Sequence, residues 1–132
     1  MHITGTVTVY GIPNCDQVKK ARSWLTGHGV DVQFHDFKKA GVTAELIRSW
    51  LTRLDCSTIL NRRGTTWRAL PADEQALVVD DASAIACMIK SPSTIKRPIL
   101  VIRNPDNHQI TGILAGFSES SYQQLLDQHQ RA

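Results

Sequence analysis

The chain has little cysteine and no long apolar run. Its three cysteines, Cys15, Cys56 and Cys87, stand far apart among 132 residues, and an odd number at such spacing argues against a disulfide framework and against a zinc site. The five histidines are scattered, so we expect no metal. No run approaches the length of a membrane span, and residues 1–5 lack the basic and apolar segments of a secretory signal. These absences predict a cytoplasmic protein, without a membrane partner, that keeps one working thiol in a reducing compartment.

Neither sign of charge is in large excess, and no internal repeat or low-complexity linker is present. There are 15 lysines and arginines against 12 aspartates and glutamates, and the net charge of +3 does not indicate a nucleic-acid partner. Hydrophobic residues make up 42% of the chain, which is enough for one core and excludes a disordered chain. The length is most simply that of a single domain over residues 1–132.

The first part of the chain predicts a strand, a helix and a second strand. Residues 6–10 are β-branched and aromatic, which is typical of a strand. A helix is expected over 15–26, with Gly27 or Gly29 at its end, and a second strand over 30–37. Two strands joined by a helix indicate a right-handed parallel crossover.

Helical patterns fill the middle of the chain. Thr43 is predicted to cap a helix whose apolar residues recur at spacings of three and four as far as Leu54. Two more helices are expected over 73–79 and 82–90.

The last part returns to β-structure. The apolar run 99–102 predicts a buried strand, 104–107 a turn, and 110–114 an antiparallel partner strand. Ser118 is predicted to cap a final helix. The order is therefore βαβ, a helical insertion, then ββα.

This element order is that of a thioredoxin-like α/β domain interrupted by a helical lobe. We expect a mixed four-stranded sheet, with the thioredoxin-like core over about 6–40 and 95–128 and the lobe over about 41–94. The whole chain would then form one domain around this core.

Cys15 stands where the first strand turns into the first helix. Gly11, Pro13 and Asn14 are typical loop residues. Asn14 is predicted to cap the helix, with Gln17 completing a pair of the capping-box type. Cys15 would then occupy the first helical position.

A cysteine at a helix start is a candidate nucleophile. The free backbone N–H groups and the positive end of the helix dipole favour a thiolate there. Lys19, four residues later, adds a cation on the same face, whereas Asp16 opposes the thiolate. The alternative is a small buried cysteine that happens to fall at a helix start. We favour the nucleophile, because strand, loop, cap and cation agree.

Arg97-Pro98 marks a second candidate site, directly before the predicted strand at 99–102. Proline lacks an N–H and is confined to the starts and edges of strands. A cis bond here would present backbone to a ligand, whereas a trans proline would simply open the strand. Arg97 is equally compatible with a ligand contact and with a solvated charge.

The segment Asn61–Arg68 is a third candidate. Its adjacent arginines, Arg62 and Arg63, suit bidentate binding of carboxylates or phosphates. They would equally suit a solvated helix end, where cations face the negative pole of the dipole. On chemistry alone the solvated end is slightly favoured, and Trp67 is expected to pack rather than to bind a ligand.

The remaining cysteines are expected to be core residues. Cys56 follows a helix end and Cys87 lies in an apolar run, and free cysteine is among the most buried residue types. Neither is close enough in sequence to Cys15 to be an obvious resolving thiol, although Cys56 could approach it in space. His35, on the second strand, is expected to be structural as well.

Together these segments resemble the arsenate reductase family of thioredoxin-fold proteins, which includes ArsC, Spx and the YffB branch. The resemblance covers roughly residues 7–128 and is strongest to the YffB branch. The matching segments are Tyr10–Cys15 with Lys19, Asn61–Arg68, Ile95–Leu100 and Gly116–Glu119. It implies the fold expected above, a catalytic cysteine at the start of the first helix and an arginine before a cis-proline. These roles fall on Cys15, Arg97 and Pro98.

Departures from the family pattern separate its branches. Arsenate reductases of this type place an arginine four residues after the cysteine, where this chain has Lys19. Their other oxyanion-binding arginines fall on or next to Asn61 and near Gly116, and no arginine stands at Gly116. Spx regulators carry a Cys-x-x-Cys switch, whose second position here is Val18. The residues that remain indicate a thiol reductase that uses one reactive cysteine and therefore needs a thiol from outside the chain.

Resemblance to the YffB branch implies that glutathione is this thiol co-substrate. Arg97, Lys19 and one of Arg62 or Arg63 would hold the glutathione carboxylates, with Asn14 and backbone beside Pro98 completing the site. The other substrate would be a small or protein disulfide. One alternative is an Spx-like regulator that docks on a partner such as RNA polymerase. The other is an arsenate reductase with a reduced arginine set.

Overall fold

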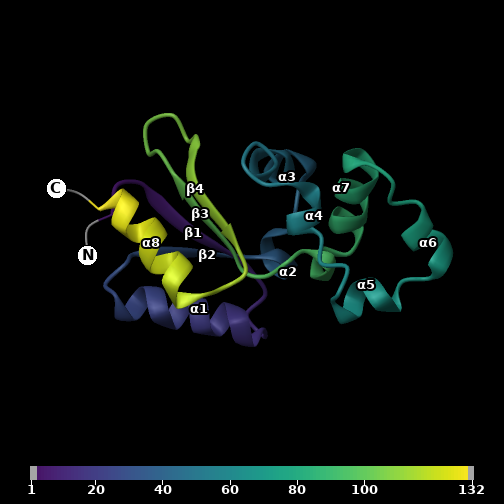
Figure 1. The fold of residues 1–132 in the computed structure, drawn as a ribbon, viewed down its shortest axis with the longest axis horizontal. Helices are drawn as coiled ribbons and strands as arrows, with labels where there is room; N and C mark the ends of the chain where they lie inside the picture. Colours follow the sequence, from purple (N-terminus) through teal and green to yellow (C-terminus); the bar gives the residue numbers. More distant parts are fainter. Residues whose placement is uncertain (1–2, 131–132) are drawn as a thin grey trace. The chain divides into compact units, whose positions relative to one another are not determined.

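A mixed four-stranded sheet organises the part of the protein that carries Cys15. In this computed structural model the strands are β1 (Thr6–Gly11), β2 (Val32–Asp36), β3 (Ile99–Arg103) and β4 (Ile110–Ala115). They lie in the order β2-β1-β3-β4 (Figure 1). Strand β1 is parallel to β2 and antiparallel to β3, which is antiparallel to β4. The predicted α/β class and mixed sheet are confirmed.

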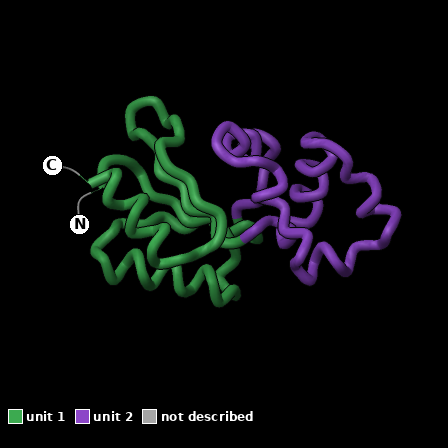
Figure 2. Tube along the Cα trace, viewed as in Figure 1, with its two compact units in different colours: residues 1–39, 97–132 green, residues 40–96 purple. Residues whose placement is uncertain are grey.

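The structure describes residues 3–130, and the chain divides into two units (Figure 2). Unit 1 takes its residues from 1–39 and 97–132 and holds the sheet, whereas unit 2 spans 40–96 and is helical. Unit 2 is therefore one contiguous stretch of sequence between β2 and β3. Across the described residues, no helix is both long and apolar enough to cross a membrane.

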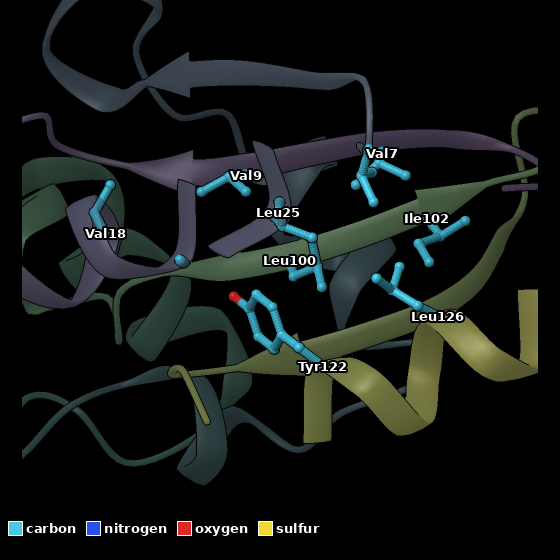
Figure 3. Packing of buried hydrophobic residues seen from close by; sticks show 10 residues of the cluster. Val7, Val9, Val18, Leu25, Leu100, Ile102, Tyr122 and Leu126 are labelled. Carbon is cyan, nitrogen blue, oxygen red and sulfur yellow. The ribbon is translucent and has the colours of Figure 1, made fainter. Parts of the chain in front are cut away.

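Helices α1 (Asp16–Gly27) and α8 (Glu119–His129) pack on the sheet and bury its main core (Figures 1 and 3). Each helix contributes an apolar stripe, and β1 and β3 contribute alternate side chains. The core residues that share this layer are Val7, Val9, Val18, Ala21, Leu25, Val30, Leu100, Ile102, Tyr122 and Leu126. The predicted Ser118 cap is confirmed, since its hydroxyl accepts a hydrogen bond from the Ser121 N–H at 3.1 Å.

The predicted cap at Asn14 is wrong, because α1 begins one residue later than expected. Cys15 itself is the N-cap, with extended backbone at φ −129° and ψ 125° and no hydrogen bond from its side chain to the helix. The helix then opens with the Lys19 N–H donating to the Cys15 carbonyl at 2.9 Å. Asn14 therefore lies outside the cap position from which a side chain reaches the first turn.

Unit 2 consists of short helices. The Thr43 cap is confirmed, since its hydroxyl accepts from the Leu46 N–H at 3.1 Å. The helix that it opens stops at Trp50, short of the predicted Leu54, and Phe37 ends the predicted second strand by starting a helical turn. The turn α2 (Phe37–Ala40) straddles the boundary between the two units. The helical elements within unit 2 are α3 (Ala44–Trp50), α4 (Cys56–Ile59), α5 (Thr65–Ala69), α6 (Ala72–Ala76), α7 (Asp81–Lys90) and the 3-10 turn η1 (Pro92–Thr94).

Candidate functional site

Strand register brings the key segments of unit 1 to one end of the sheet. Tyr10, near the end of β1, pairs with Ile99 at the start of β3, and Ile99 also pairs with Ala115 at the end of β4. The loop to Cys15 therefore leaves the sheet at the end where the segment at Pro98 enters it.

Cys15 is half-buried and packs against the core layer under α1. The first N–H groups of a helix have no acceptor within the helix, and the positive end of its dipole lies at the same place. Both favour a thiolate on a residue that directly precedes the helix. Lys19 and Asp16 are both exposed, so water screens their opposing charges. The nucleophilic role of Cys15 stays a prediction.

The end of β1 makes a close contact with α1, and this contact sets the distance between the two elements that the Cys15 loop joins. A Cβ on Gly11 would lie 2.7 Å from Cγ2 of Val18, which is fully buried in the first turns of α1. Only a residue without a side chain lets the strand end approach the helix this closely.

The Arg97–Pro98 peptide bond is cis, as the family resemblance implied. Pro98 is buried and Arg97 is half-buried. The Pro98 carbonyl accepts a hydrogen bond from the Gly116 N–H at 2.8 Å, and the Lys96 N–H donates to the Ile59 carbonyl at 2.7 Å. Two backbone groups beside Pro98 are therefore already engaged within the protein, which restricts the predicted pairing with an extended peptide.

Gly116 follows β4 in a conformation that favours glycine. Its φ is 80°, so any side chain there is strained. We expect Gly116→Ala to lower the free energy of unfolding by about 1 kcal/mol. Gly27→Ala is the matched control, because a Cβ at Gly27 meets nothing within 4 Å. Urea titration of both variants checks this, and equal stabilities would contradict it.

A groove lies between α1 and the start of α8, and its lining on α1 begins at Lys19, four residues after Cys15. Its volume is about 640 Å³, and its walls carry Lys19, Lys20 and Glu119 beside apolar surface from Trp24 and Phe117. Both aromatic rings pack edge-on against Tyr122, at 5.9 and 4.8 Å between centroids. Sequence reasoning missed this groove, although Lys20, Ser23 and Trp24 recur at spacings of three and four on α1.

Two of the arginines predicted to bind anions, Arg62 and Arg63, belong to unit 2. Arg62 and Arg63 are exposed, and the Arg62 guanidinium lies 4.7 Å from the centre of the Trp67 ring. Trp67 is buried, which confirms its packing role. Asn61 accepts from the Arg63 N–H at 3.2 Å and so orders the turn. The role of Arg62 or Arg63 in binding glutathione stays a prediction.

Comparison with known proteins decides the family. The ArsC family model matches residues 10–125. The chain belongs to the ArsC family. Membership supports an oxidoreductase at a coarse level, and the predicted resemblance to the YffB-like branch is confirmed.

This ArsC-family chain is similar in sequence to proteins of three different descriptions. The solved structure of a YffB protein is 40% identical with a TM-score of 0.82, covering 92% of this chain and 99% of its own. An arsenate reductase-related protein from Brucella melitensis is 44% identical with a TM-score of 0.65, covering 90% and 92%. The global transcriptional regulator Spx of Streptococcus pyogenes is 31% identical over 97 residues, covering 72% of this chain and 71% of the regulator.

The two other cysteines of this ArsC-family chain are half-buried, so the prediction that both are core residues is wrong. Cys56 is the first residue of the single-turn helix α4. Burial raises the pKa of the Cys56 thiol, the Asp81 carboxylate raises it further by charge and hydrogen bonding, and Arg62 partly offsets this. Cys87 lines a separate groove in unit 2.

Thiol alkylation should follow these environments. At pH 7 we expect iodoacetamide to label Cys15 faster than Cys56, because a raised pKa keeps the Cys56 thiol protonated. The rate at Cys56 should climb only at a pH above that at which an ordinary cysteine titrates, because its pKa is raised. Peptide mass spectrometry at several pH values gives both rates, and faster labelling of Cys56 at pH 7 would exclude Cys15 as the reactive thiol.

Proposed function

We propose that this protein is a glutathione-dependent thiol reductase in which Cys15 is the single nucleophile. The observation that carries the proposal is the position of Cys15. It is the one cysteine of residues 1–39 and 97–132, it is half-exposed, and it directly precedes α1 at the sheet end where the cis Arg97–Pro98 segment enters.

The first step is attack of the Cys15 thiolate on a mixed disulfide between a substrate thiol and glutathione. Sγ of Cys15 bonds to the glutathione sulfur, the original S–S bond breaks, and the substrate leaves as a thiolate that takes a proton from water. The start of α1 stabilises the attacking Cys15 thiolate, and the half-exposed side chain of Cys15 remains accessible to the substrate.

The second step needs a thiol from outside the chain. Val18, at the position where a Cys-x-x-Cys protein would carry its resolving cysteine, is fully buried and apolar. A second glutathione thiolate then attacks the glutathione sulfur bound to Cys15, which releases glutathione disulfide and restores the Cys15 thiolate. The substrate disulfide is reduced, and one glutathione is oxidised.

Charges around Cys15 suit a small zwitterionic peptide. Lys19 and Lys20 supply cations for the two glutathione carboxylates, and Glu119 faces them across the groove as a partner for the ammonium group. Arg97, Asn14 and the backbone at Pro98 are the further contacts that we assign. That Arg62 or Arg63 binds a glutathione carboxylate stays a prediction from the sequence.

Intact mass tests the proposal directly. After incubation with glutathione disulfide, wild type should gain one glutathione, and added glutathione should remove it. Cys15→Ser should gain none, whereas Cys56→Ser and Cys87→Ser serve as matched controls that keep the adduct. An adduct on Cys15→Ser, or none on wild type, would show that another thiol reacts or that glutathione is not the partner.

A protein-binding regulator is the second candidate, favoured by the 31% identity to Spx over 97 residues. Such a role would not need the thiol. The Cys15→Ser variant discriminates, because a regulator keeps its cellular effect in this variant and a reductase loses it.

Arsenate reduction is the remaining alternative, and we expect it to be negligible. Lys19 offers a point charge where an arginine fork would grip the oxyanion, and the positive φ of Gly116 strains any arginine placed there. A coupled assay on wild type checks this. Arsenate turnover comparable to glutathione-dependent disulfide reduction would make the chain an arsenate reductase.

A further inference from the structure

Unit 2 leaves large apolar side chains in water. Leu77 is 71% exposed, Val79 is 80% exposed and Ile89 is 39% exposed. Within residues 3–130 these are the large hydrophobic side chains that stand exposed, and all three lie on or beside α6 and α7. Leu77 and Val79 lie two positions apart in the segment that joins α6 to α7, and an exposed apolar patch of this kind marks an interaction site.

An apolar groove lies between α6 and α7. Its volume is about 400 Å³, and its floor is formed by Leu70, Leu77, Val78, Ala86 and Cys87. The groove exists because α6 has only five residues and buries none of them. We call this groove, together with Leu77 and Val79, the α6–α7 face.

Polar contacts hold α6 in place beside α7. Lys90 pairs with Glu74 at 3.2 Å across the groove, and Gln75 donates to the Trp67 carbonyl at 2.8 Å. Ser83 accepts from the Val79 N–H at 2.9 Å. The groove is therefore a formed feature, since hydrogen bonds and an ion pair fix both of its walls.

The charge around this face is negative. Residues 68–90 contain four acids, Asp73, Glu74, Asp80 and Asp81, and two cations, Arg68 and Lys90, which leaves a charge of −2 in a chain whose net charge is +3. One of these acids, Glu74, is paired with Lys90. Hydrogen bonds from Ser83 lower the pKa of the exposed Asp80 carboxyl, so this group stays ionised.

Charge decides between the possible occupants. Nucleic acid and anionic lipid surfaces would be repelled by the carboxylates. A second copy docking through the same face would place acid against acid, because a two-fold interface pairs a patch with itself. The other described surfaces of the chain offer no exposed large apolar side chain to fill the groove.

We propose that the α6–α7 face is a docking site for a basic amphipathic helix of another protein. The apolar side chains of that helix would enter the groove beside Leu77 and Val79, and its lysines or arginines would face Asp73 and Asp80. The site lies in unit 2 and does not depend on the reaction assigned to Cys15. Failure of one proposal therefore leaves the other untouched.

The test is a titration of the full chain, labelled with ¹⁵N, with two synthetic helical peptides of roughly four turns. Both carry leucines on one face, and their other positions are lysine in one peptide and glutamate in the other. We expect the lysine peptide to shift amide signals within residues 70–91 and the glutamate peptide to leave them unmoved. No shifts, shifts confined to unit 1, or equal effects of both peptides would overturn the proposal.

Variants sharpen the result. Leu77→Ser with Val79→Ser should weaken binding of the lysine peptide at least about tenfold, or about 1.4 kcal/mol. Asp73→Asn should weaken it at low salt, whereas its matched control Asp106→Asn, in the exposed turn after β3, should not. Unchanged binding in the double variant would overturn the proposal. So would a concentration-dependent dimer of wild type that the double variant loses in sedimentation, because the occupant would then be a second copy.

Discussion

Cys15→Ser should abolish glutathione-dependent disulfide reduction while leaving the protein as stable as wild type or more so. A hydroxyl cannot form the mixed disulfide, so turnover should fall by a factor on the order of 10³ or more. Cys15 is the N-cap of α1 and makes no capping hydrogen bond. Serine is a preferred N-cap, worth about 1 kcal/mol, so the same substitution should raise the free energy of unfolding.

Two measurements on one variant check this prediction. Turnover is followed with a glutathionylated peptide and a coupled assay for glutathione disulfide, and stability by urea titration. Cys56→Ser and Cys87→Ser are the matched controls and should keep most of the activity. If Cys15→Ser retains turnover, Cys15 is not the nucleophile. If the variant loses activity because it unfolds, the prediction that serine can replace Cys15 as the N-cap of α1 is wrong.

Arg97→Ala should weaken glutathione binding more than it weakens the fold. A charge-assisted hydrogen bond contributes about 1.5–3 kcal/mol, so KM for glutathione should rise by roughly 10- to 100-fold with a smaller change in kcat. Arg97 is half-buried, and part of its side chain remains accessible to a ligand. The conservative variant Arg97→Lys keeps the charge but loses the planar fork, so it should recover only part of the affinity.

Kinetics and thermal denaturation of both Arg97 variants separate its two possible roles. A binding role predicts a raised KM at nearly unchanged melting temperature. If the melting temperature collapses in both variants and KM for glutathione is unchanged, Arg97 supports the fold and does not bind glutathione.

The strands and the helix caps at Thr43 and Ser118 could be predicted because each is encoded locally. β-Branched runs, turn residues and hydroxyl caps act over a few positions. The start of α1 was predicted wrongly, because Asn14 is a preferred N-cap residue and Cys15 is not. The backbone angles of Cys15 decided the outcome, and they depend on how β1 meets α1.

The parts of the site that sequence reasoning missed depend on contacts between distant residues. Cys56 interacts with Asp81, 25 positions away, and this contact could not be read from either residue's neighbours. The groove between α1 and the start of α8 needs Trp24 from α1 and Phe117 from the segment before α8. The exposure of Leu77 follows from the shortness of α6, which the sequence pattern predicted to be longer.

The division of unit 1 by unit 2 sets the order in which the surroundings of Cys15 are assembled. Thr6 of β1 pairs with Arg103 of β3, so this pairing must close a loop that contains all of unit 2. Residues 40–96 are contiguous and helical, so their contacts are local and form fast. On the ribosome, Cys15 therefore emerges long before its surroundings exist, and the growing chain completes the sheet end beside Cys15 only after Arg97 and β3 have been synthesised.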